Sequence, residues 1–227
     1  MELFLISIVV WFSALFFLKP NPADLRAKIL TRLESFKKIK ATYALGMSFI
    51  IVFFITSDGT FIKSDDTWLG LLGINNIEKF TLLWFAQTFT STFVHINFLS
   101  HLLPNLVFLG ILSFYERGVS TGRFIAVFLF GGVLSSASVL LQSEPMGSVG
   151  ASGGLCALAG ACLLDTPGLR RRDYALGFCL IAFVLLASSF SETKGLNFEV
   201  DFWAHALGLI FGALFCKLFP RKKATAS

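Results

Sequence analysis

The chain has 227 residues, of which 55% are hydrophobic, 15% are charged and 27 are Phe. Soluble domains carry about a quarter charged residues, and a soluble core of this size would leave much of the apolar surface exposed to water. The composition therefore excludes an ordinary soluble domain and predicts an integral membrane protein. The net charge of +5 lies in short clusters between apolar runs, not in a basic domain, so we expect no nucleic-acid partner.

Seven apolar runs are long enough, or nearly long enough, to cross a bilayer as helices. A hydrocarbon core of about 30 Å requires roughly 20 helical residues, and about 17 are tolerated. The runs are residues 2–18, 41–57, 97–115, 124–141, 149–164, 174–190 and 202–219. The run 149–164 is the shortest and extends only about 24 Å as a helix. Its N-terminus is therefore expected to lie below the outer membrane surface.

Lysine and arginine gather in alternate loops, which the positive-inside rule keeps in the cytoplasm. The basic clusters lie between the first two runs, at Arg117 and Arg123, at 170–172 and at 221–223. The intervening loops carry mainly acidic residues, so we expect a multi-pass protein with a cytoplasmic C-terminus. The small size and the absence of an Arg-rich, acid-poor leader favour a prokaryotic plasma membrane.

The predicted organisation is one helical core with short appendages. Residues 1–40 form a hydrophobic segment, expected to be an extra N-terminal membrane helix, and a basic cytoplasmic linker; residues 41–219 form the core, and residues 220–227 a basic tail. The connection 58–95 mixes aromatic, aliphatic and polar residues, which suits short helices at the membrane interface. The cysteines are expected to be small core side chains, without a disulfide or metal site. They are Cys156, Cys162, Cys179 and Cys216.

Polar side chains inside membrane spans are candidates for function, because lipid tolerates few of them. His101 and Asn105 lie one helical turn apart, so both project from one face of their span. His205 lies in the last span and is followed by Gly208 and Gly212, which allow close helix packing.

Ser152 stands in a glycine-rich sequence at the start of the short run. Gly150 and Gly153 let the backbone approach closely, and a helix start leaves N–H groups without intrahelical partners. Such N–H groups and the helix dipole favour the negative charge of an oxyanion. A serine hydroxyl is a weak nucleophile unless a base accepts its proton, and His205 is placed to do so from another helix. The residues therefore predict a Ser152–His205 dyad.

The predicted topology puts Ser152, His205, His101 and Asn105 at one depth, in the outer half of the bilayer. A helical bundle can bring them together, so we expect the oxyanion to be held by the Ser152 N–H and by the side chains of His101 and Asn105. We expect no acidic residue inside a span to orient the base, since Asp201 is predicted to lie near the surface.

In their order and spacing these residues closely resemble the rhomboid proteases, over residues 41–219. The resemblance rests on Gly150-Ala151-Ser152-Gly153 with Ala157-Leu158-Ala159-Gly160, on Ala204-His205-Ala206-Leu207-Gly208 with Gly212, on His101 with Asn105, and on Glu116-Arg117 with Gly122-Arg123-Phe124. It implies an all-α membrane fold with a six-helix core, the serine beginning the fourth helix and the histidine in the sixth. It also implies cleavage of transmembrane segments of other proteins without metal or organic cofactor, His101 and Asn105 stabilising the oxyanion, and a structural role for Glu116.

At three places the sequence departs from the usual rhomboid pattern. Cys156 occupies a position, four residues after the serine, that is often aromatic, and Ala86-Gln87 stands in place of a Trp-Arg pair. The interval from His95 to His101 is one residue longer than usual, and His95 is expected to be a loop-packing residue beside water.

Three other functions are alternatives. A catalytically inactive rhomboid-like protein that binds membrane clients would lack Ser152 or His205, and both are present. A transporter or channel would place charged residues along the whole bilayer, and we expect none in the inner half. A zinc protease would need a ligand motif such as H-E-x-x-H, which is absent, and of the three histidines His95 is predicted to lie at a different depth from His101 and His205.

Overall fold

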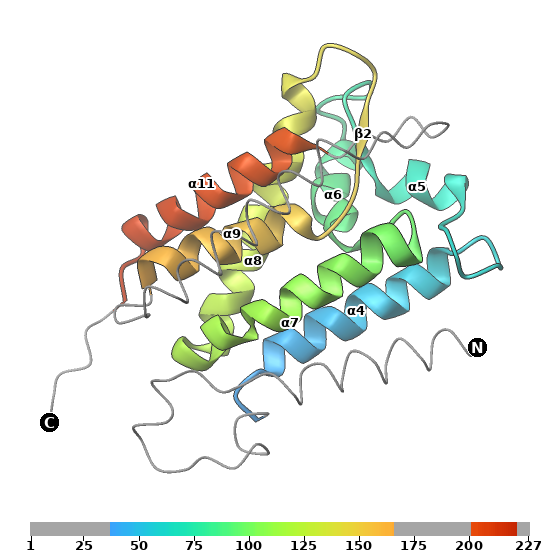
Figure 1. Cartoon of the computed structure of the whole chain (residues 1–227). Coiled ribbons are helices and arrows are strands. Elements are labelled where there is room, and N and C mark those ends of the chain that lie inside the picture. Colours follow the sequence, from blue (N-terminus) through green and yellow to red (C-terminus); the bar gives the residue numbers. More distant parts are fainter. Residues whose placement is uncertain (1–36, 166–200, 222–227) are drawn as a thin grey trace, which may run out of the picture.

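The computed structural model describes residues 37–165 and 201–221. The predicted spans 2–18 and 174–190, together with Cys179, lie outside the described residues. Five long helices dominate the described part (Figure 1). They are α4 (Lys40–Thr56), α7 (Leu103–Gly118), α8 (Thr121–Ser136), α9 (Ser152–Asp165) and α11 (Phe202–Leu218), and they occupy the other five predicted spans.

Two of these helices are extended by turns of different pitch. A π-helical turn, η2 (Phe98–Leu102), leads into α7, and a 3₁₀ turn, η3 (Ala137–Leu141), continues α8. The resulting helices, Phe98–Gly118 and Thr121–Leu141, have 21 residues each and are long and apolar enough to cross a membrane, whereas α4, α9 and α11 are apolar but shorter. The described part is therefore mostly helical with two helices of membrane-spanning length, and the predicted six-helix core stays a prediction.

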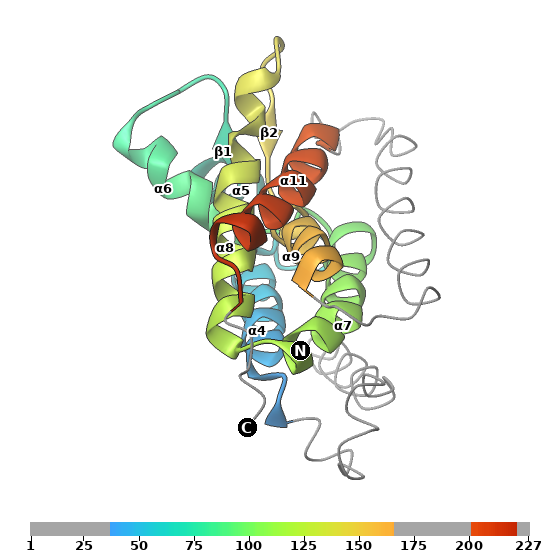
Figure 2. The ribbon, with the colours of Figure 1, turned by 90° about the vertical axis from the view of Figure 1, so that its left-hand side faces the viewer.

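Helix α9 lies at the centre of the bundle, packed between α8 and α11 (Figure 2). Its residues from Gly153 to Cys162 are all buried. Gly131 of α8 lies against the Ala157 side chain and Gly212 of α11 against the Ala157 carbonyl, so a methyl group on either glycine would collide with α9. Small residues let helix backbones approach in this way, and the resulting van der Waals contacts hold helices together where lipid supplies no hydrophobic drive.

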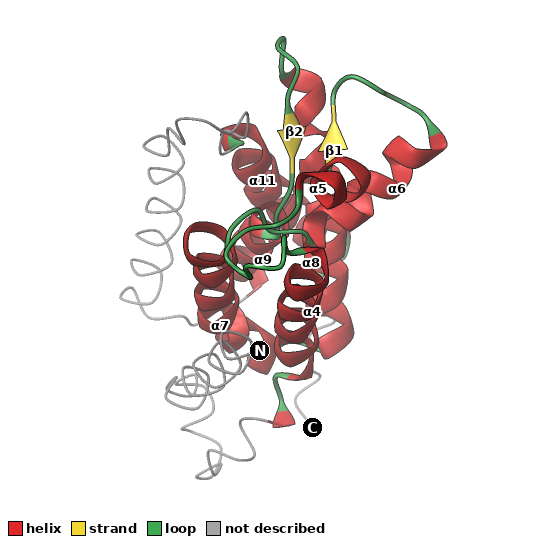
Figure 3. Cartoon of the chain, turned by 90° about the vertical axis from the view of Figure 1, so that its right-hand side faces the viewer, coloured by secondary structure: helices red, strands yellow, loops and turns green. Residues whose placement is uncertain are grey.

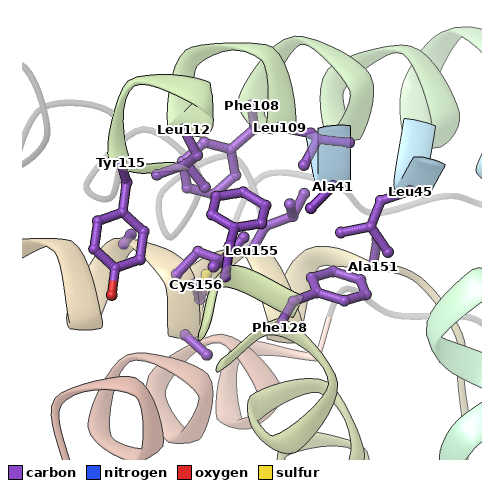
Figure 4. Packing of buried hydrophobic residues seen from close by; sticks show 14 of the residues in the cluster. Ala41, Leu45, Phe108, Leu109, Leu112, Tyr115, Phe128, Ala151, Leu155 and Cys156 are labelled. Atoms are coloured by element: carbon purple, nitrogen blue, oxygen red, sulfur yellow. The ribbon is translucent and has the colours of Figure 1, made fainter. Parts of the chain in front are cut away.

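Large apolar side chains fill the space between α9 and the helices α4, α7 and α8. The labelled members of this buried cluster are Ala41, Leu45, Phe108, Leu109, Leu112, Tyr115, Phe128, Ala151, Leu155 and Cys156 (Figure 4). Ala151 belongs to the loop just before α9, so the core also fixes the chain at the point where α9 begins.

The connection between α4 and α7 folds into short elements, as the sequence predicts. They are α5 (Asp66–Leu72), β1 (Ile74–Asn75), α6 (Leu82–Thr90) and the 3₁₀ turn η1 (Ser91–Phe93). Ile77, Phe80 and Leu82 are exposed on this connection, which suits contact with lipid at the interface. The sequence did not predict that β1 pairs antiparallel with β2 (Gly147–Ser148), so that the connection is tied to the loop before α9 (Figure 3).

Glu116, near the end of α7, caps the start of α4. Its carboxylate accepts the N–H groups of Ala41 at 2.7 Å and Thr42 at 2.8 Å, and the Thr42 hydroxyl at 2.8 Å. These N–H groups belong to the first helical turn, which has no intrahelical acceptors for them. The contacts agree with the structural role that the rhomboid resemblance implies for Glu116.

Asp165, the last residue of α9, joins three further helices at the same end of the bundle. Its carboxylate accepts the Tyr115 hydroxyl at 2.7 Å and Arg123 Nε at 2.5 Å, and Arg123 also donates to the Phe219 carbonyl at 2.7 Å. Glu116 and Asp165 are buried one residue beyond the predicted spans 97–115 and 149–164. Both carboxylates are bonded to helix ends and neighbouring side chains, not aligned along a pathway.

Candidate active site

Ser152 is the first residue of α9 and follows β2 through a tight turn. The helix begins there and not at residue 149, so the predicted span began three residues too early. The reason is Gly150, whose φ of +125° is incompatible with a helix and suits glycine alone. The Gly150 N–H donates to the Ser91 carbonyl at 2.8 Å, which anchors the turn. The first-turn N–H groups of α9, including that of Ser152, have no intrahelical acceptor and remain as donors for an anion.

His205 lies in the first turn of α11 and is 3% exposed. Helix α11 approaches α9 closely at this level because Gly208 has no side chain, and a methyl group there would collide with the Gly153 carbonyl. The Ala204 carbonyl in turn lies 3.7 Å from the point where a Cβ of Gly153 would stand. The neighbour of Ser152 thus packs against the neighbour of His205, and the structure brings the two predicted dyad residues to the same level of adjoining helices.

A hydrogen bond between a catalytic serine and its histidine can be long in the resting state of an enzyme and tighten when substrate binds. The backbone contacts of Gly153 with Gly208 and Ala204 place Ser152 and His205 at the same level of α9 and α11.

The His101 imidazole lies directly on the turn that precedes Ser152. A Cβ on Gly150 would collide with His101 Nε2 and stand 2.8 Å from Cε1. The Ile96 N–H donates to His101 Nδ1 at 3.1 Å. A neutral imidazole has one acceptor and one donor nitrogen, so the proton of His101 is on Nε2, the nitrogen that faces Gly150. The ring is also close enough to His205 for the charges of the two imidazoles to interact.

Asn105 is 5% exposed, and its amide donates to the His101 carbonyl at 2.7 Å. The amide nitrogen carries two hydrogens, so this bond leaves one of its donors for another acceptor. Asn105 therefore binds the backbone of the turn that carries the His101 imidazole.

Among the described residues, no group of three or more His, Cys, Asp or Glu side chains is arranged to hold a metal ion. The site is made instead of a serine at a helix start, a buried histidine on the adjoining helix and a second histidine that presents an N–H.

Residues 83–222 match the rhomboid domain family, which is more than half of the 227 residues. The chain belongs to the rhomboid family. The matched stretch contains Ser152, His205, His101 and Asn105, and the family resemblance read from the sequence is confirmed. No curated protein matches the chain.

The extra residue between His95 and His101 of this rhomboid protein is accommodated in the π-helical turn. There the Leu102 N–H donates to the Asn97 carbonyl, five residues back, at 2.8 Å. Pro104 follows; it has no N–H, and its ring disfavours the ordinary bond to the carbonyl four residues back. A π turn absorbs one additional residue without ending the helix. The insertion therefore leaves His101 and Asn105 in contact.

Cys156 is wholly buried at a level where α9 and α11 approach closely. A Cβ on Gly208 would stand 3.1 Å from the Cβ of Cys156. The space between the two helices therefore suits the small thiol side chain of Cys156, which stands where rhomboid proteases often have an aromatic ring.

Trp84 and Gln87 hold the connection between α4 and α7, where the usual rhomboid pattern has a Trp-Arg pair. The Trp84 indole N–H donates to the Asn75 carbonyl at 2.8 Å, and Gln87 Nε2 donates to the carbonyls of Gly70 at 3.2 Å and Leu71 at 3.1 Å. Both side chains are buried. The sequence pattern puts Ala86 at the position of the tryptophan, whereas the buried tryptophan of this connection is Trp84, two residues earlier.

His95 does not lie beside water as expected, because its side chain is fully buried. Its ring centroid is 5.1 Å from that of His101 and 5.2 Å from that of Phe49. This burial, with the nearby His101 acting in the same direction, lowers the pKa of His95 well below its usual value, so the ring is neutral. His95 thus packs behind His101.

Sequence reasoning missed three polar residues around the site. Ser135 lies against Gly153, Ser138 donates a hydrogen bond to Asp201, and Asp201 is buried, not at the surface as expected. Two signals pointed to them: a serine cluster at the end of an apolar run, and an aspartate just before another run, in the position of a helix cap.

Proposed function

We propose that this rhomboid protein is an intramembrane serine endopeptidase that cleaves transmembrane segments of other membrane proteins with the dyad Ser152 and His205. The observation that carries the proposal is the backbone contact of Gly153 with Gly208 and Ala204, which puts the start of α9 beside the first turn of α11. Ser152 and His205 are each one residue away from this contact.

In the proposed reaction the Ser152 oxygen attacks the carbonyl carbon of the scissile peptide bond while His205 accepts the hydroxyl proton. The tetrahedral intermediate collapses with cleavage of the C–N bond, and His205 gives its proton to the leaving amine. A water molecule, deprotonated by His205, then hydrolyses the acyl-enzyme and restores the serine. The residues need no metal or organic cofactor for these steps.

The oxyanion of the intermediate would be stabilised by donors converging on the turn around Gly150. The His101 tautomer presents Nε2–H on that turn, the Ser152 N–H lies at the helix start, and Asn105 retains an amide hydrogen. Removing one donor from an oxyanion hole typically costs about 10² to 10³ in kcat. His101 is thus proposed as a catalytic residue and Asn105 as its partner.

The proposed substrates are helices that unwind locally, because a helical peptide bond is protected by its own hydrogen bonds. Gly and other weak helix formers near the scissile bond would lower the free-energy cost of unwinding. Each Gly in place of Ala lowers that cost by about 1 kcal/mol. The charge pattern of the loops further supports a site that opens to the extracytoplasmic side of a prokaryotic plasma membrane, with the C-terminus in the cytoplasm.

A serine-reactive fluorophosphonate distinguishes this protease from the alternative, an inactive rhomboid protein that binds membrane clients. We expect the probe to label native protein at Ser152, as located by peptide mass spectrometry, and to leave Ser152→Ala and His205→Ala unlabelled. Absence of labelling in native protein, alongside a labelled active control, would favour the client-binding alternative.

A further inference from the structure

Asp201 is buried, with 7% exposure, and directly precedes α11. One carboxylate oxygen, Oδ1, accepts the Ala204 N–H at 3.0 Å, and the Asp201 carbonyl accepts the His205 N–H at 3.3 Å. The first turn of α11, which carries His205, is therefore built on Asp201 as its N-cap.

The second carboxylate oxygen of Asp201 connects α11 to the end of α8. Oδ2 accepts a hydrogen bond from the hydroxyl of Ser138, which is fully buried in η3. Three residues earlier, Ser135 lies against Gly153, so that a Cβ on this glycine would stand 2.9 Å from the Cβ of Ser135. The segment 135–138 therefore touches both helices of the dyad, beside Ser152 on one and one turn before His205 on the other.

The charge of Asp201 acts on His205. Within residues 37–165 and 201–221 no cation forms an ion pair with Asp201. The Asp201 carboxylate lies one helical turn before His205, on the turn that its side chain caps. The titratable groups on the neighbouring described elements include His101, which lies against Gly150, and Cys156 of α9, which lies against Gly208; neither supplies a negative charge in its neutral form. A carboxylate near an imidazole favours the protonated ring.

We infer that Asp201 is a positioning residue for His205: held by Ser138, it fixes the turn that carries the imidazole and stabilises the imidazolium that forms when His205 accepts the Ser152 proton. The inference rests on the proposed protease function and adds a third group to the dyad. The contacts that place the Asp201 carboxylate are those with the Ala204 N–H and the Ser138 hydroxyl.

Histidine titration by NMR tests this inference without relying on activity. The chain contains three histidines, so ¹³C-histidine labelling in detergent micelles gives few signals, and His205→Ala identifies that of His205. Asp201→Asn removes the charge but keeps the shape, since Asn caps helices as well as Asp. Asp65→Asn is the matched control, because Asp65 caps α5 in the same way by accepting the Thr67 N–H at 2.8 Å.

We expect Asp201→Asn to lower the midpoint of the His205 titration by roughly one pH unit and kcat by about tenfold, with KM unchanged. The control should change neither. Ser138→Ala should also lower kcat, whereas Ser136→Ala, whose hydroxyl bonds to the Thr88 carbonyl at 3.0 Å, should not.

An unchanged titration midpoint of His205 in Asp201→Asn would overturn the inference. Asp201 would then be a simple helix cap, and Asp201→Ala would lower only the thermal stability. A shifted midpoint in a protein that cleaves no substrate would instead refute the proposed protease function and leave the Asp201–His205 coupling standing.

Discussion

Gly208 of α11 lies directly against the backbone carbonyl of Gly153 of α9, with no side chain between the two helices at this point. The contact lies one residue after Ser152 and three residues after His205. The separation of the two proposed dyad residues is therefore set by backbone packing, which tolerates no added atom.

Gly208→Ala should accordingly abolish cleavage of a model transmembrane substrate and lower the free energy of unfolding in mixed micelles by about 1 to 3 kcal/mol, because the methyl group must push α11 away from α9. Gly122→Ala is the matched control, since a Cβ at this helical glycine of α8 meets nothing within 4 Å. It should be neutral or stabilise by up to about 1 kcal/mol. Equal activity of the two variants would contradict the packing argument.

Gly150 and Gly59 form a second matched pair, since both have positive φ, +125° and +85°. Gly59→Ala meets open space and should cost only backbone strain of about 1 to 2 kcal/mol, with cleavage unaffected. Gly150→Ala also collides with His101, so kcat should fall by about 10²-fold or more as the oxyanion donor is displaced. The prediction fails if the kcat values of both variants are the same.

Replacement of each buried imidazole by Phe separates the roles of His101 and His95. His101→Phe keeps a ring but removes Nε2–H, so kcat should fall by about 10² to 10³ while fluorophosphonate still reaches Ser152. His95→Phe should change kcat little, because the neutral His95 ring packs behind His101 and its Nε2 has no hydrogen-bond partner in the described part of the chain. A larger loss of kcat in His95→Phe than in His101→Phe would reverse the assignment.

Glu116→Ala should lower the free energy of unfolding by about 1 to 3 kcal/mol for each α4 donor left without its acceptor. These donors are the N–H groups of Ala41 and Thr42 and the Thr42 hydroxyl. Thermal unfolding in detergent, compared with Glu78→Ala at an exposed position, measures the effect. If Glu116→Ala unfolds at the same temperature as the control, the cap does not stabilise α4.

The sequence was most informative where the physical constraint was local. Apolar length located α4, α7, α8, α9 and α11, because a helix is the structure that satisfies its own backbone in lipid. The four-residue spacing of His101 and Asn105 predicted that both lie on one face of their helix, since one helical turn separates them. The glycines at 150, 153, 208 and 212 were marked as points of close approach, which the structure confirms.

The features that sequence reasoning missed depend on contacts between distant segments. The bond from Ser138 to Asp201 joins residues 63 positions apart, and the pairing of β1 with β2 involves two residues on each strand, too few for a periodic pattern. Asp201 was expected near the surface because it directly precedes the last predicted span, 202–219. The hydrogen bonds from Ala204 and Ser138 offset the cost of burying its charge.

Cleavage by native protein, Ser152→Ala and His205→Ala in proteoliposomes, with a model transmembrane substrate, tests the central claim most directly. We expect native protein to cut the substrate within its membrane segment and both variants to lose cleavage by at least about 10³-fold, since each lacks one member of the dyad. Undiminished cleavage by either variant would contradict the assignment of Ser152 as nucleophile and His205 as base.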